Sequence, residues 1–324
     1  MEAEEFLLVR DLFRSFAGRF RIGSADEVKP SARAAAQQAL VELGLGELRR
    51  STPPAATVQE CALLAEEHGR QPLTTSLLGT VLLAPELLRI VGAERRSDSG
   101  TTPTVALARD LRFPPAGTSE LVAWDCEGAD SALCVTSDGA VTRAELGPRA
   151  PSADLLRGIR TVGSPQRIIG RLDAPELQHW QAYALVMVSG ELVGAAREFV
   201  EQSVAYARER RQYGQAIGEF QAVQHLLADA TVALEACVSA TRYAAWCLDN
   251  EPPGRALTAA RVAKAEVNRS TVEAVQAGMQ VFGGIAQTWE HIAHLYLRKV
   301  LLGATVLATT ADLLVPLAEP EVTR

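Results

Sequence analysis

Aromatic residues are scarce in this 324-residue chain, at 5%, and alanine and leucine dominate the apolar set. Both are strong helix formers without a β-branch, so the composition favours helices over sheets. The 5 cysteines form no CxxC pair, which argues against a disulfide framework and favours buried free thiols in a reducing compartment. The net charge of -7 argues against nucleic acid or an anionic membrane as the main partner.

Long apolar runs are also missing. No stretch approaches the roughly 18 consecutive apolar residues that a membrane-spanning helix needs. The first residues, MEAEEFLLVRDLFRSF, are acidic where a signal peptide would be basic. No GxGxxG phrase follows a predicted strand, which excludes a Rossmann dinucleotide site. We therefore expect a cytoplasmic, mainly helical protein.

The pattern along the chain divides it into three predicted units. Residues 1–112 have a helical pattern, in which Thr57 and Glu60 form a predicted capping box. Residues 113–172 contain short β-prone runs around an Asp-Gly pair at 138–139, which is a hairpin signal. Residues 173–324 read as long amphipathic helices with short connections, and an antiparallel four-helix bundle is the natural architecture.

Breaks between the C-terminal helices follow from proline and glycine. The phrase DNEPPGR at 249–255 ends one helix, because proline cannot continue it. The phrase GGIA at 283–286 interrupts the next one. From there TWEHIAHLYLRKVLLGATVLATTADLLVPL predicts one further helix.

Two phrases of the C-terminal unit carry a resemblance to a known family. ARERRQYGQAIGEFQAVQHLLAD at 207–229, followed by QVFGGIAQTWEHIAHLYLRKV at 280–300, resembles the C-terminal domain of acyl-CoA dehydrogenases. The N-terminal phrases ELGLGEL and LLAEEHGRQP resemble that family's first helical domain. The resemblance implies an N-terminal helical domain, a middle β domain and a C-terminal four-helix bundle. It also implies FAD at a subunit interface, where a carboxylate takes the α-proton of an acyl-CoA thioester and FAD takes the β-hydride.

The resemblance also implies which residues contact FAD. The matching positions are Arg210, Gln212, Gln221, Gln280, Gly283 and Gly284. A dinucleotide pyrophosphate needs positive charge, hydrogen-bond donors and backbone that can come close, and these residue types supply all three. The family phrase usually ends GGxG, and Ala286 stands at its last position, so a methyl group is expected near the cofactor.

Other parts of the family pattern are absent. A Thr-Glu-Pro-x-x-Gly-Ser phrase and a Lys-x-Trp-Ile phrase, which hold the flavin ring, do not occur between 101 and 172, where only the second half of the middle domain is matched. The register puts Leu307 and Ala184 at the two positions where members of the family carry the catalytic carboxylate. Neither side chain can act as a base. Glu191, within two turns of Ala184, is left as the candidate base.

In dimers of this family, the FAD contacts kept here act across the subunit interface, whereas the missing phrases act within the subunit. The resemblance therefore implies a short subunit that contacts the FAD of a larger acyl-CoA dehydrogenase subunit, as in the heteromeric enzymes of bacterial steroid catabolism. Electron-transfer flavoprotein is then the expected electron acceptor. Two alternatives stay open: a scaffold or regulatory subunit, and a stand-alone homo-oligomer acting on acyl-CoA or acyl-carrier-protein thioesters.

One further cluster invites a metal interpretation. Glu290, His291 and His294 have helical spacing, but histidines at this spacing are more often packed or solvated residues. The resemblance accounts for them without a metal, and no metal site is expected.

Overall fold

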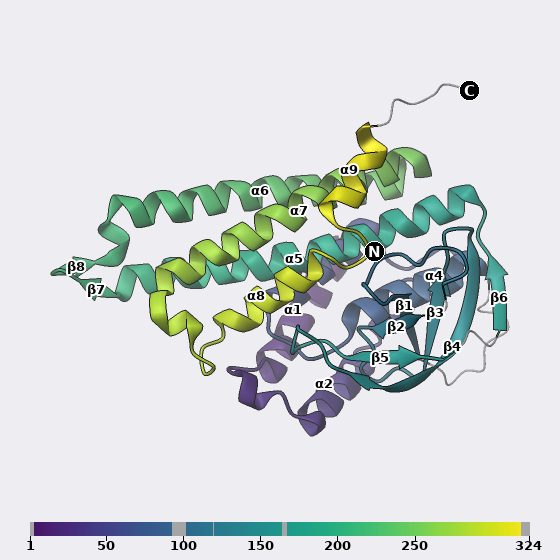
Figure 1. Cartoon of the computed structure of the whole chain (residues 1–324), viewed down its shortest axis with the longest axis horizontal. Helices are drawn as coiled ribbons and strands as arrows, with labels where there is room; N and C mark the ends of the chain where they lie inside the picture. Colours follow the sequence, from purple (N-terminus) through teal and green to yellow (C-terminus); the bar gives the residue numbers. More distant parts are fainter. Residues whose placement is uncertain (1–2, 93–101, 119, 164–166, 319–324) are drawn as a thin grey trace.

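Four other helices pack along one long helix, α5 (Ala174–Glu209), which runs through the molecule (Figure 1). The computed structural model describes residues 3–92, 102–118, 120–163 and 167–318. Helix α5 begins with a reciprocal capping box, in which the Asp173 and Glu176 side chains each accept a hydrogen bond from the other residue's N–H. Every residue from 182 to 196 is buried, because helices or strands cover this segment on all sides.

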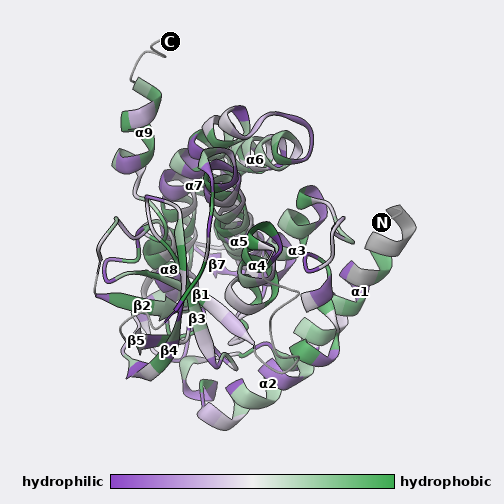
Figure 2. Cartoon of the chain, turned by 90° about the vertical axis from the view of Figure 1, so that its right-hand side faces the viewer, coloured by the Kyte–Doolittle hydropathy of each residue, from purple (hydrophilic) through white to green (hydrophobic). Residues whose placement is uncertain are grey.

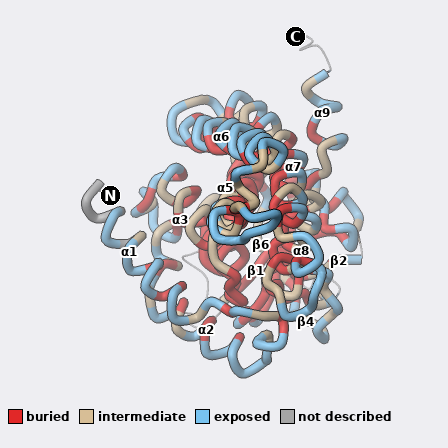
Figure 3. Tube along the Cα trace, turned by 90° about the vertical axis from the view of Figure 1, so that its left-hand side faces the viewer, coloured by how far each residue is buried: buried red, intermediate tan, exposed pale blue. Residues whose placement is uncertain are grey.

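Three helices complete the C-terminal bundle. These are α6 (Gln221–Asn250), α7 (Pro253–Phe282) and α8 (Ala293–Gly303). The predicted breaks are confirmed, since α6 ends before the proline pair and α7 ends before the glycine pair. Figure 3 shows how the helices differ in burial: α5 is buried in the centre and α6 exposes its outer face.

The prediction of a single helix after the glycine pair is wrong, because the structure has two helices there. Helix α8 ends at Gly303 and α9 runs over Thr310–Ala318. Between them Leu307 has a left-handed backbone, with φ of 71°, and its backbone bonds to the segment around Leu111. A contact with a distant segment therefore ends the helix.

Of the N-terminal helices the third packs most extensively against α5, and in Figure 2 the strands lie on the other side of α5 from that helix. The helices are α1 (Ala3–Phe20), α2 (Pro30–Glu42), α3 (Val58–Arg70) and α4 (Ala84–Val91), and a π-helical segment Leu77–Leu83 leads into α4. The capping box of Thr57 and Glu60 is confirmed at the start of α3. Every residue of 77–88, in the π-helical segment and the first part of α4, is buried.

Six strands form the sheet between the helical parts. They are β1 (Pro103–Ala108), β2 (Leu121–Trp124), β3 (Ser131–Val135), β4 (Ala140–Ala150), β5 (Ile159–Val162) and β6 (Arg167–Arg171). Their order is β3-β1-β2-β5-β4-β6, with a further pairing of β3 with β4. The first five strands therefore close into a ring, and β6 is added outside β4. Only the β1–β3 pairing is parallel among the pairings of these described strands.

Small side chains fill the inside of this ring. A separate buried cluster consists of Ala106, Leu121, Ala123, Cys126, Ala129, Ala132 and Cys134. The larger residues of the same strands, such as Leu107 and Leu133, belong instead to the main core shared with the helices. A ring of five strands leaves little interior space, which suits alanine and cysteine.

The predicted hairpin at the Asp-Gly pair is confirmed. Strands β3 and β4 pair antiparallel, and Gly139 between them has a φ of 82°, which favours glycine. The sheet begins at Pro103, before residue 112, where the predicted helical unit ends and the predicted β unit follows. The division of the chain into three units stays a prediction.

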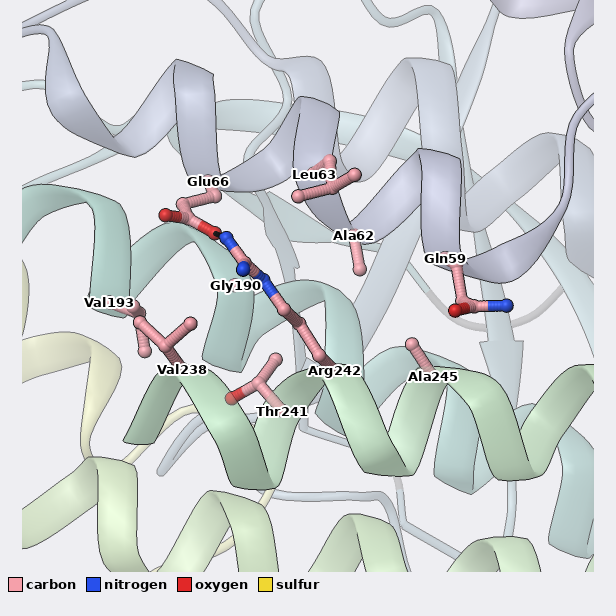
Figure 4. A pocket seen from close by; sticks show the side chains of 10 residues that line it. All are labelled: Gln59, Ala62, Leu63, Glu66, Gly190, Val193, Val238, Thr241, Arg242 and Ala245. Carbon is pink, nitrogen blue, oxygen red and sulfur yellow. Dashed lines mark hydrogen bonds and ion pairs between the residues drawn. The ribbon is translucent and has the colours of Figure 1, made fainter. Parts of the chain in front are cut away.

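Helices α3 and α5 approach each other unusually closely through glycines. A Cβ atom at Gly194 of α5 would lie 1.9 Å from the Glu66 carbonyl oxygen, and one at Gly69 of α3 would lie 2.0 Å from the Glu191 carbonyl oxygen. Helix α6 does not pack as closely against α3 and α5. A cavity of about 80 Å³ therefore lies between the three helices (Figure 4). The ion pair between Glu66 and Arg242, at 3.5 Å, bridges this cavity.

We expect the Gly194→Ala variant to lose about 1–3 kcal/mol of unfolding free energy, because the new methyl group forces the two helices apart. Urea unfolding measures this loss. Gly18→Ala is the matched control, since a Cβ there meets nothing within 4 Å and alanine favours the exposed helix. Equal stability of the Gly194→Ala and wild-type proteins would contradict the close packing.

Candidate functional site

Unpaired positive charge gathers where α5 ends. Arg208, Arg210 and Arg211 are all exposed, and in the described part of the chain no carboxylate oxygen lies within 4.0 Å of their guanidinium groups. The backbone of Arg210 is held on both sides: its N–H donates to the Tyr206 carbonyl at 2.8 Å, and its carbonyl accepts from Ile217 N–H at 2.8 Å. This fixed backbone presents the Arg210 side chain to solvent, where none of the described residues pairs with it.

A small hairpin follows Arg210. Strands β7 (Arg211–Gln212) and β8 (Gln215–Ala216) are joined through Tyr213 and Gly214, whose φ values are 52° and 86°. Gln212 is exposed on this hairpin, and the exposed Gln221 begins α6 directly after it. Both predicted glutamines therefore lie at the same end of the bundle as Arg210 (Figure 1).

The glycine pair ends α7 beside this hairpin end. The Phe282 ring lies 4.6 Å from the Tyr206 ring, which brings the last turn of α7 against the last turns of α5. Gly283 has φ 65° and ψ -143°, a backbone region that is essentially restricted to glycine. At Gly283 and Gly284 an added Cβ would meet nothing within 4 Å, and Gln280 is exposed beside them. The structure thus brings all six predicted positions to one end of the bundle, with open backbone at the glycines.

The location of the Ala286 methyl group differs from the expectation that this group lies near a cofactor. Its side chain is fully buried and belongs to the chain's own core. The methyl group replaces glycine on the inner side of the 3₁₀ turn Gly283–Gln287. It does not narrow the open space over the glycine pair.

At Leu307, where the resemblance places a family carboxylate, the backbone is bonded within the chain. Leu307 is buried, its N–H donates to the Leu111 carbonyl at 2.7 Å, and its carbonyl accepts from Phe113 N–H at 3.0 Å. Leu111 also has a left-handed backbone, with φ of 66°, so two strained leucines meet here. The alternative position, Ala184, is fully buried within α5.

The loop that carries Leu307 is held by a buried lysine that the sequence analysis missed. Lys264 Nζ donates to the Gly303 carbonyl at 3.0 Å and also to Asn268 Oδ1. Asn268 Nδ2 in turn donates to the Ala308 carbonyl at 3.2 Å. Burial lowers the pKa of Lys264 to about 7. The signal in the sequence was its spacing of four from both Ala260 and Asn268, which places it on the buried stripe of α7.

Glu191 lies within a buried ionic network. Its carboxylate pairs with Arg157, accepts a hydrogen bond from His68 Nδ1 at 2.6 Å, and lies 3.6 Å from Lys299 Nζ. Burial by itself would raise the pKa of Glu191, but the charges of Arg157 and Lys299 and the bond from His68 outweigh it and hold the pKa well below its usual range. A buried carboxylate with three partners favours a structural role over the role of base that the sequence suggested.

Arg157 connects this network to the sheet. Its Nη1 lies 2.5 Å from Asp125 Oδ1, and its Nε lies 3.7 Å from Asp154 Oδ2. Burial raises the pKa of Asp154 and lowers that of His68, so both are biased toward their neutral forms. Asp125 also accepts a hydrogen bond from Gly79 N–H at 2.7 Å. The network therefore joins the N-terminal helices, the sheet and the bundle.

The Glu290 cluster forms no convergent set of ligands. His291 Nδ1 accepts a hydrogen bond from Ala293 N–H at 3.1 Å, and His294 Nε2 donates to the Trp289 carbonyl at 3.0 Å. Glu290 is exposed. No group of three or more His, Cys, Asp or Glu side chains able to hold a metal ion occurs within the described ranges.

Comparisons with known proteins define the class of this fold. Residues 183–306 match the family model of the acyl-CoA dehydrogenase C-terminal domain. Acyl-CoA dehydrogenase IpdE2 of Mycobacterium tuberculosis is 29% identical over 261 residues, which cover 79% of this chain and 75% of that protein. A variant of the Tcur3481–Tcur3483 steroid ACAD has the same fold, with a TM-score of 0.80 at 20% identity over 97% of this chain and 96% of that one.

The ChsE4–ChsE5 complex from Mycobacterium tuberculosis contains a further chain of this fold, with a TM-score of 0.76 at 17% identity, covering 98% and 97% of the two chains. The match to the acyl-CoA dehydrogenase C-terminal domain thus covers residues 183–306 of the chain, and the chain as a whole shares the fold of these two solved structures. Among the helices that the structure describes, none has the length and apolarity needed to span a bilayer.

We expect the Glu191→Gln variant to lose about 3–5 kcal/mol of unfolding free energy, because it removes one of the three carboxylates around Arg157 and the only described carboxylate within 4.0 Å of Lys299. Denaturant unfolding measures the loss. Glu198→Gln on the same helix is the control: it breaks the less buried pair with Arg70 at 2.9 Å and should cost about 1 kcal/mol or less. Unchanged stability in Glu191→Gln would reopen its role as a base.

The Lys264→Met variant should change the pH dependence of stability. The folded pKa of Lys264, about 7, lies below its ordinary value of 10.5. Between these values the unfolded chain binds more protons, so this group makes the wild type more stable as pH rises. The stability of the variant relative to wild type should therefore fall by up to about 1.4 kcal/mol per pH unit above neutrality.

Unfolding of both proteins at a series of pH values above neutrality tests this slope. Lys29→Met removes an exposed ammonium group and serves as the control. A parallel pH dependence for wild type and Lys264→Met would show that the buried ammonium does not titrate in this range.

Proposed function

We propose that this chain is a subunit of an FAD-dependent acyl-CoA dehydrogenase that contacts FAD across an interface with a larger partner. The observation that carries the proposal is the contrast between the two ends of α5. At one end Arg210 is exposed and unpaired in the described part of the chain. At the other end the Leu307 backbone is bonded to Leu111 and Phe113, so the chain closes on itself where the family keeps its carboxylate.

The residues at the Arg210 end fit a dinucleotide. The Arg210 guanidinium would pair with the pyrophosphate, and the exposed backbone at Gly283 and Gly284 would allow close approach. The amide groups of Gln212, Gln221 and Gln280 would supply further hydrogen bonds, as the resemblance to the family implies. When bound, FAD supplies the acceptor for the β-hydride of an acyl-CoA thioester.

The base for α-proton removal would come from the partner. Leu307 and Ala184 carry no proton acceptor, and Glu191 is held by Arg157 and Lys299 with a pKa far below its usual range. A carboxylate so strongly stabilised as an anion is a poor proton acceptor. The larger subunit would also hold the flavin ring, and electron-transfer flavoprotein would take the electrons.

Two related structures support this division of roles between subunits. Two solved structures of this fold carry two-component names, Tcur3481–Tcur3483 and ChsE4–ChsE5. A scaffold or regulatory subunit is the second candidate, favoured by the absence of a carboxylate at Leu307 and Ala184. A stand-alone homo-oligomer acting on acyl-CoA or acyl-carrier-protein thioesters would need a base that none of these three positions offers.

Visible absorbance tests the proposal. We expect the chain to be colourless when purified alone and yellow after co-expression with a larger acyl-CoA dehydrogenase encoded beside it, with one FAD per pair of subunits. Arg210→Ala should weaken FAD binding by about 10- to 100-fold, because it removes a charge-assisted contact. Arg211→Ala is the matched control, since the neighbouring arginine is equally exposed and lies outside the matching positions.

Each alternative gives a different result. A yellow chain in the absence of a partner would show FAD binding by the single chain and overturn the division between subunits. A colourless but stable complex would favour the scaffold. Equal loss of colour in both arginine variants would assign binding to general positive charge instead of the Arg210 position.

A further inference from the structure

A second cavity lies far from the Arg210 end. Its volume is about 260 Å³, and it is lined by Arg112, Phe113, Gln181, Leu185, Leu257, Arg261, Leu307, Ala308, Asp312 and Leu313. Gln181 lies near the start of α5, 29 residues before Arg210, which corresponds to about 43 Å along the helix. The cavity is therefore separate from the proposed dinucleotide contacts.

Arg261 is the unusual member of this lining. Its side chain is half-buried, yet within the described residues its guanidinium group has no hydrogen bond and no carboxylate oxygen within 4.0 Å. Burial lowers the pKa of Arg261, as expected for a cation that has lost hydration without gaining a partner. Such a group favours binding of an anion.

The other charges at the cavity are already paired. Arg112 and Asp312 lie 3.3 Å apart at the exposed rim, and Asp110 also contacts Arg112 at 3.5 Å. Asp312 in addition accepts hydrogen bonds from the N–H and hydroxyl of Thr309. The lining therefore carries a net charge of one positive unit, from Arg112 and Arg261 against Asp312, and the unmatched unit is that of Arg261.

The remaining wall is mainly apolar. Four leucines, a phenylalanine and Ala308 form most of the lining, and the Gln181 carboxamide makes no side-chain hydrogen bond in the described part. A single guanidinium beside one free amide suits a carboxylate, whereas the Asp312 carboxylate at the rim disfavours a doubly charged phosphate. The volume lies just below the range of about 300–1,000 Å³ that holds drug-sized ligands, so the ligand must be small.

We propose that this cavity binds a small monocarboxylate, whose carboxylate group pairs with Arg261 and Gln181 and whose short apolar body packs against the leucines. The site goes beyond the proposed FAD contacts and does not depend on them. Straight or cyclic apolar acids such as butanoate, hexanoate, cyclohexanecarboxylate and benzoate have this chemistry.

Calorimetric titration of the full chain with these four acids tests the proposal, together with hexanamide as the uncharged analogue of hexanoate. At least one acid should bind at millimolar concentration or below, and hexanoate should bind about tenfold or more tightly than hexanamide. Arg261→Gln should weaken binding of that acid by about 10- to 100-fold, and Arg261→Lys should restore part of it because the charge is kept.

Arg255→Gln is the matched control. Arg255 lies on the same helix, pairs with Glu251 at 3.1 Å and is largely exposed, so its loss should leave binding unchanged. Circular dichroism of each variant verifies folding. The proposal is overturned if none of the four acids binds at millimolar concentration, if hexanamide binds as tightly as hexanoate, or if the Arg261→Gln and Arg255→Gln variants bind alike.

Discussion

The buried contact between Arg157 and Glu191 is the constraint on which the rest of the structure depends. Its partners come from α3, the sheet, the loop before β5, α5 and α8. Charged groups removed from water must find their partners, so burial of this network fixes the relative position of all these segments at once. The sheet and the bundle cannot move apart without exposing or separating charges, and this fixed arrangement keeps the segment around Leu111 against Leu307.

The two ends of α5 thereby acquire opposite chemistry. One end is enclosed by leucines and by backbone hydrogen bonds within the chain, apart from the small cavity beside Arg261. The other end presents arginine and glutamine side chains and bare glycine backbone outward. At one end of α5 the polar groups of the chain bond to each other, and at the other end they are exposed to solvent. The exposed polar groups are suited to contact a second molecule. This asymmetry is the physical basis of the proposed division between two subunits.

Local features of the fold were predictable, and long-range ones were not. Thr57 with Glu60, the Asp-Gly turn and the break at the proline pair depend on neighbouring residues, and each was predicted correctly. The break between α8 and α9 depends on a contact 196 positions away, between Leu307 and Leu111, which no local pattern reports. The six predicted cofactor positions lie together because they bracket helix ends. The partners of Glu191 come from distant segments, so its enclosure could not be read from the sequence.

Closure of five strands into a ring has a consequence for the behaviour of the protein in concentrated solution. Among the strands that the structure describes, each of β1 to β5 has a neighbour on both sides, whereas β6 pairs only with β4. An unpaired edge is a template for intermolecular strand addition. This edge is short and has Arg167 and Arg171 at its ends, both exposed. Like charges would meet if two such edges paired, so this edge of the sheet resists intermolecular strand addition.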